Sequence, residues 1–243
     1  EASFTWYLRF VQQIDAVRLP QLNRIAFSCL DWSCEAVALL WEQRSRADLD
    51  ANTTNTLLTL ALDNGCIKKE FFEELAWQVI RTEQNIKLVQ LIAGKLAADG
   101  QRQLAADIYN YGLEFTQDES TLLEILIKQA VLHQVRGDYP NARRFARKIL
   151  AQHPGHELAH ELIGDLYFDS YYNCKKGISR VEDRAIFIAA YRQYELAGAA
   201  EKMNLAKEQF PSGQEIFEDL FSVNEVFTVG CWVNESVRLD KRD

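Results

Sequence analysis

The sequence contains little proline and little glycine, with four and eleven of them in 243 residues. Proline breaks helices and glycine weakens them, so this shortage permits long helices. A basic excess is also absent, because 27 Lys and Arg stand against 35 Asp and Glu, giving a net charge of −8. Phosphate recognition needs a basic face, so the composition argues against a nucleic-acid partner. No apolar run approaches the ~20 residues that span a bilayer, so we expect no membrane-spanning segment.

Several familiar site motifs are missing as well. The sequence has no P-loop, dinucleotide fingerprint or nucleophile elbow, so we expect no cofactor. Its five cysteines form no CxxC pair, which disfavours a zinc ribbon. Cys29, Cys34 and Cys66 fall in helical patterns, where a buried free thiol is the ordinary expectation. Cys174 and Cys231 fall in irregular or strand-like segments. The chain starts at Glu1 rather than at methionine, so we expect that a signal peptide or a longer N-terminal region has been removed.

Helical periodicity dominates what is present. Segments such as 121–135 and 142–152 carry apolar residues at i, i+3, i+4 and i+7 spacing. Short breaks centre on Gly65, Gly100 and Gly137, which are 35 and 37 residues apart by subtraction. That spacing is close to the ~34-residue period of a helix–turn–helix repeat. The pattern predicts stacked helix pairs.

Residues 137–168 carry the clearest repeat signature. Ala142 and Ala146 suit close helix packing, and Pro154 ends one unit. Ile163, Gly164 and Tyr167 then resemble the large–small–aromatic pattern in the first helix of a tetratricopeptide repeat (TPR). We therefore predict an all-α fold: an α-α superhelix, or TPR-like helix-pair solenoid, with a short C-terminal β-strand or hairpin. The expected domains are N-terminal helical pairs at 1–85, TPR-like repeats at 86–200, and a capping helix with a β tail at 201–243.

The C-terminal half has a closer resemblance. The segments "LIGDLY", "AIFIAAYRQYELAG" and "VFTVGCWVNESVRL" resemble the ends of exported TPR proteins of Bacteroidota-type Gram-negative bacteria. The resemblance covers about 120–243 and implies export to the periplasm or cell envelope, with Cys174 and Cys231 paired. Such a bridge would close a 57-residue loop and contribute ~4 kcal/mol on the chain-entropy model. Two free thiols in a reducing cytoplasm are the alternative.

One stretch spells a metalloprotease motif. His156, Glu157 and His160 form HELAH, which on a helix would place two zinc-ligand imidazoles one turn apart, with the glutamate as general base. The extended motif fails, because Ile163 replaces its glycine and no histidine follows His160. The repeat register gives these residues packing and capping roles instead. We favour that structural interpretation, with a zinc-dependent metallohydrolase as the alternative function.

The repeat register also predicts a binding surface. In a TPR array, positions 2, 5, 9 and 12 of the inner helices face the concave groove. Here they mix carboxylates with apolar residues, so a basic or amphipathic protein or peptide is the expected partner, and a solvated face without a ligand is the alternative. The predicted groove residues are Glu124, Ile127, Val131, Gln134, Leu158, Glu161, Asp165 and Phe168.

The outer helix carries a basic run, which we expect to be a solvated face, with docking of an acidic partner as the alternative. The run consists of Arg143, Arg144, Arg147 and Lys148. We expect the strand-like tail, with Trp232, to fold back as a cap on the last repeat, and addition of its strand to the sheet edge of a partner is the alternative. The predicted function is a non-catalytic interaction or scaffold module, and the sequence leaves its oligomeric state open.

Overall fold

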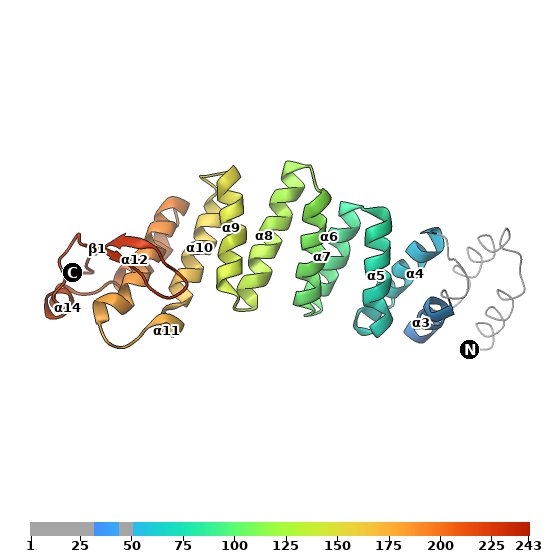
Figure 1. The fold of residues 1–243 in the computed structure, drawn as a ribbon, viewed down its shortest axis with the longest axis horizontal. Helices are drawn as coiled ribbons and strands as arrows, with labels where there is room; N and C mark the ends of the chain where they lie inside the picture. Colours follow the sequence, from blue (N-terminus) through green and yellow to red (C-terminus); the bar gives the residue numbers. More distant parts are fainter. Residues whose placement is uncertain (1–31, 44–50) are drawn as a thin grey trace, which may run out of the picture. The chain divides into compact units, whose positions relative to one another are not determined.

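A computed structural model describes residues 32–43 and 51–243 of the chain (Figure 1). Within these ranges the protein is all-α apart from one two-stranded sheet near the C-terminus. The chain divides after Phe115 into two compact units, and each is treated separately below. The predicted fold class is confirmed, since paired helices with a small terminal β hairpin make up the described structure.

The N-terminal unit is built from pairs of short helices. α4 packs against α5, and α6 packs against α7. Gly112 makes the second of these contacts possible, because a Cβ built there would lie 2.7 Å from Cγ1 of Val89. Their bounds are α3 Cys34–Gln43, α4 Ala51–Asp63, the 3₁₀ helix η2 Cys66–Lys68, α5 Glu70–Glu83, α6 Ile86–Ala98 and α7 Arg102–Phe115.

The C-terminal unit continues the same plan. α8 packs on α9, α9 on α10, α10 on α12 and α12 on α13. The predicted close approach at Gly164 is present, because a Cβ there would lie 2.5 Å from Cε1 of Tyr194 on α12. Ala142 and Ala146 are fully buried, as expected. The bounds are α8 Glu119–Val135, α9 Tyr139–Gln152, α10 Glu157–Asp169, α11 Tyr171–Cys174, α12 Arg180–Ala197, α13 Ala200–Glu208 and α14 Gly213–Glu218.

Side-chain caps fix where several of these helices begin. Asp118 accepts a hydrogen bond from the backbone N–H of Thr121 and so starts α8. Asp138 caps α9 in the same way, directly after Gly137, whose φ of 75° suits glycine. Ser212 and Glu215 form a reciprocal capping box at α14. The breaks seen in the sequence are therefore genuine helix boundaries.

The C-terminal tail forms the predicted hairpin. β1 (Val226–Thr228) pairs antiparallel with β2 (Ser236–Arg238), with Phe227 opposite Val237. Val229, Val233, Val237 and Leu239 are almost fully buried, so the tail adds its own apolar residues to the core of the C-terminal unit.

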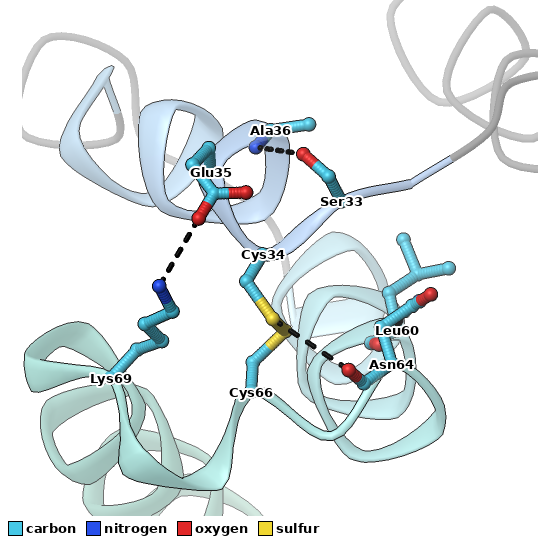
Figure 2. Close-up of a disulfide and its surroundings, with 8 residues drawn as sticks. All are labelled: Ser33, Cys34, Glu35, Ala36, Leu60, Asn64, Cys66 and Lys69. Carbon is cyan, nitrogen blue, oxygen red and sulfur yellow. Dashed lines mark hydrogen bonds and ion pairs between the residues drawn. A yellow bond between two sulfur atoms is a disulfide. The ribbon is translucent and has the colours of Figure 1, made fainter.

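Within the described residues, two disulfides join parts of the chain that are distant in sequence. Cys174 and Cys231 are bonded, as the resemblance implied. Cys34 and Cys66 are bonded as well, so the expectation of buried free thiols at these two positions was wrong (Figure 2). They lie 32 residues apart, close to the repeat period, which brings the start of α3 beside η2. Cys29 lies outside the described residues, as do residues 1–31 and 44–50 of the N-terminal helical pairs predicted at 1–85.

The structure leaves the proposed division at 85 and 200 as a prediction. The helix pairs α4–α5 and α6–α7 span residues 51–83 and 86–115.

Candidate functional site

An apolar groove runs between the first helices of two successive pairs, α8 and α10. Its volume is about 260 Å³. Leu158 stands at its rim with 62% of its surface exposed, and Val131 is exposed opposite. The lining residues are Ile127, Ala130, Val131, Gln134, Ala146, Ile149, Leu158, Ala159, Glu161, Leu162 and Asp165.

Six of the eight residues predicted from the repeat register line this groove. The two exceptions are Glu124 and Phe168, which lie outside the lining. The ring of Phe168 packs edge-on against that of Phe187, with the ring centroids 5.1 Å apart. The register did not identify the floor, where Ala130, Ala146 and Ala159 leave room between the larger side chains. Small residues at facing helix positions were visible in the sequence and could have indicated this hollow.

Two carboxylates, Glu161 and Asp165, line one edge of the groove, and the row they belong to continues beyond the lining at both ends. Glu157, Glu161, Asp165 and Asp169 recur every four residues along α10, so they share one side of the helix. Lys202 on α13 pairs with two of them, its Nζ lying 2.7 Å from Glu161 Oε1 and 2.7 Å from Asp165 Oδ1. One cation thus serves the middle of a four-carboxylate row.

The negative charge of this row shifts the pKa values of the groups beside it. Partial burial raises the pKa of Asp169, and the charge of Asp165 raises it further. Burial likewise raises the pKa of the Tyr194 phenol, helped by Asp165, to which the phenol donates at 2.9 Å. Burial alone would lower the pKa of Lys202, but its hydrogen bonds to Asp165 and Glu161 raise it above the usual value.

The HELAH residues occupy structural positions. The His156 side chain caps α10 by accepting from the N–H of Ala159 at 3.3 Å. His160 is buried, with Nε2 2.8 Å from the carbonyl oxygen of Pro154 and Nδ1 2.9 Å from Oε1 of Gln193 on α12. Both ring nitrogens therefore have protein partners within this chain. Among the described residues, no cluster of three His, Cys, Asp or Glu side chains is placed to hold a metal ion.

The C-terminal tail packs on the other side of α10. Leu158 and Tyr167 are nine positions apart, which puts them about 180° apart at roughly 100° per residue. Tyr167 donates to Glu235 Oε1 over 2.7 Å, and burial raises the pKa of this phenol to about 12. The tail therefore leaves the groove side of α10 uncovered.

The basic run on α9 holds this tail. Arg143 donates to the carbonyl oxygen of Trp232 at 2.9 Å, and its guanidinium carbon lies 4.7 Å from the centroid of that indole ring. Arg147 pairs with Glu235. The prediction of a solvated face was wrong for Arg143, whose side chain is only 14% exposed beneath the tail, whereas Arg147 pairs with Glu235 and still keeps 52% of its side chain exposed. Arg144 remains exposed over the ring of Phe145.

Comparisons with known proteins add little. No family model matches the chain, and no curated protein matches it. Among solved structures, the chain is similar to the C-terminal part of a TPR repeat-containing protein from Cytophaga hutchinsonii. The identity is 10%, the TM-score is 0.26, and the match covers 85% of this chain and 93% of the other. The fold description above therefore rests on the helix pairing itself. In the part of the chain that the structure describes, no helix has the length and apolarity to span a bilayer.

Proposed function

We propose that this chain is a non-catalytic protein-interaction module of the TPR type, which binds a segment of another protein in the groove between α8 and α10. The observation that carries this proposal is the pairing of an uncovered apolar groove with a carboxylate row along its edge. An exposed leucine beside a hollow floored by alanines suits an apolar anchor side chain.

The carboxylate row specifies the second property of the partner. Glu161 and Asp165 share Lys202, whereas Glu157 at one end and Asp169 at the other form no ion pair within the described residues. A segment with Lys or Arg on one side and apolar residues on the other complements both features. We therefore infer a basic amphipathic partner, presented as a helix or an extended strand.

A peptide-display selection against the purified chain tests this function. Selected peptides should combine apolar anchors with Lys or Arg. The double variant Leu158→Ser/Val131→Ser should then weaken their binding at least about tenfold, measured by fluorescence anisotropy. The matched control is Leu196→Ser, which changes an exposed leucine of α12 outside the groove lining. Peptides that bind the double variant as well as the wild type would contradict the assignment.

The proposal extends to the compartment. Two disulfides favour an oxidising environment, because such bonds are rare in a reducing cytoplasm. Together with the resemblance of 120–243 to exported Bacteroidota-type TPR proteins, they support a periplasmic or envelope location for the scaffold.

A further inference from the structure

Large apolar side chains protrude at the end of the C-terminal unit. Ile178 is 86% exposed in the loop before α12, Phe217 is 80% exposed on α14, and Leu220 is 91% exposed just beyond it. We call these three residues the terminal tips. Tyr172 on α11 is also 75% exposed. None of the three lines the groove of the proposed function.

The terminal tips belong to one surface. Asp219, between Phe217 and Leu220, accepts hydrogen bonds from Ser179 Oγ at 2.6 Å and from the N–H of Val181 at 3.1 Å. The loop that carries Ile178 therefore lies against the segment that follows α14. Figure 1 shows α14 beside the start of α12 at this end of the unit.

The loop around Ile178 is held in place on both sides. Cys174 anchors its start through the disulfide to Cys231. Asp183 accepts from the backbone N–H groups of Lys176 and Gly177 at 2.7 and 2.9 Å. Its end is fixed by Asp219, as above. An isoleucine presented on a pre-ordered loop loses little conformational entropy on binding.

Basic side chains lie close in sequence to Ile178, one of the terminal tips. Lys175 and Lys176 precede Ile178 in the same loop and are exposed, and within the described residues neither forms an ion pair. Arg180 pairs with Glu215 at 3.5 Å while its side chain stays 76% exposed. Glu182 is half-buried on α12 and Glu218 is exposed on α14, so the local charge is mixed. Burial of the apolar tips must therefore supply most of the binding free energy, and the lysines add a preference for anions.

We propose that this end of the C-terminal unit docks on an anionic lipid surface. The terminal tips are separate projections rather than a hollow, and the boundary between headgroups and acyl chains can bury projections in any arrangement. Lys175 and Lys176 then lie at the level of the headgroups, where each cation favours anionic lipid. The net charge of −8 opposes this only weakly, because charges beyond ~8 Å are screened at physiological salt.

Vesicle co-sedimentation of the oxidised, full chain tests the proposal. Wild type should sediment with phosphatidylglycerol-containing vesicles and more weakly with pure phosphatidylcholine vesicles. Ile178→Ser/Leu220→Ser should weaken partitioning at least about tenfold on both. Lys175→Gln/Lys176→Gln should reduce binding to the anionic vesicles only. Val135→Ser, an exposed apolar residue of α8, should behave as wild type.

Three results would overturn the inference. The first is wild-type protein that stays in the supernatant with both vesicle types. The second is an Ile178→Ser/Leu220→Ser variant that sediments like wild type. The third is a lipid-free wild type that light scattering shows to be a dimer, with the same double variant monomeric, which would assign the tips to a second copy. The peptide-binding assay is independent, so either proposal can fail alone.

Discussion

The indole Nε1 of Trp232 donates a hydrogen bond to Oγ of Ser170 over 3.0 Å, and so joins the C-terminal tail to the end of α10. Ser170 is fully buried and itself donates to the carbonyl oxygen of Leu166 at 2.7 Å. The Trp232 ring also lies 5.6 Å from that of Tyr167. The tail is thus attached across the side of the helix pairs, and is more than an end cap.

Removing this ring should destabilise the protein. Trp232→Ala loses the indole contacts with Tyr167 and Arg143 and leaves Ser170 without its donor. We expect the free energy of unfolding to fall by about 2–3 kcal/mol and the melting temperature to fall by roughly 5–10 °C. Differential scanning fluorimetry of Trp232→Ala and Trp232→Phe measures this, with the phenylalanine variant expected in between. An unchanged melting temperature for the alanine variant would show that this ring does not hold the tail on α10.

Gly164 should tolerate no side chain. Its missing Cβ makes room for the ring of Tyr194, 2.5 Å from where that atom would lie. Gly164→Ala must displace the buried ring of Tyr194 or separate α10 from α12, and should cost about 2–3 kcal/mol. Gly155→Ala is the matched control, because nothing lies within 4 Å of its Cβ position, and it should change stability by less than about 0.5 kcal/mol. Urea unfolding compares the two. Equal midpoints would show that the helices adjust freely.

Gly164 and Trp232 illustrate which contacts could be predicted from the sequence and which could not. Gly164 was predictable because the repeat pattern is local, and a small residue at one register position has one packing meaning. The contact between Arg143 and Trp232 spans 89 residues, and nothing near Arg143 distinguishes it from a solvated arginine. The pair Cys34–Cys66 was missed because each thiol was considered within its own helix. Their spacing of nearly one repeat places them at neighbouring ends of stacked elements.

His160 should behave as a buried packing residue. His160→Ala removes the imidazole that contacts the carbonyl of Pro154 and the amide of Gln193. We expect the free energy of unfolding to fall by about 2–3 kcal/mol. Protein purified without chelator should contain no stoichiometric zinc by elemental analysis, and EDTA should not shift its melting temperature. Stoichiometric zinc that disappears in His160→Ala would establish the metallohydrolase instead.

Both disulfides should be found by peptide mapping. Mass spectrometry of a non-reduced digest should yield the linked pairs Cys34–Cys66 and Cys174–Cys231, each separating after reduction. Cys174→Ser/Cys231→Ser should lower the free energy of unfolding by ~4 kcal/mol, because the bond closes a loop of 57 residues in the unfolded chain. Free thiols at all four positions, in protein isolated under oxidising conditions, would count against export.

Glu215 should make the C-terminal unit acid-sensitive. Burial alone would raise its pKa, but the Ser212 N–H and the charges of Arg184, Arg242 and Arg180 outweigh burial and hold the pKa below its usual 4.5. A pKa lowered by folding means that the ionised carboxylate stabilises the fold above about pH 4.5, and that this contribution disappears as the pH falls through the folded-state pKa. Glu215→Gln should therefore cost about 2 kcal/mol at pH 7, and its deficit relative to wild type should shrink below about pH 4.5. Urea unfolding across this pH range measures the difference, with the exposed Glu218→Gln as control. A deficit that is constant with pH would mean that shape, rather than charge, explains the loss.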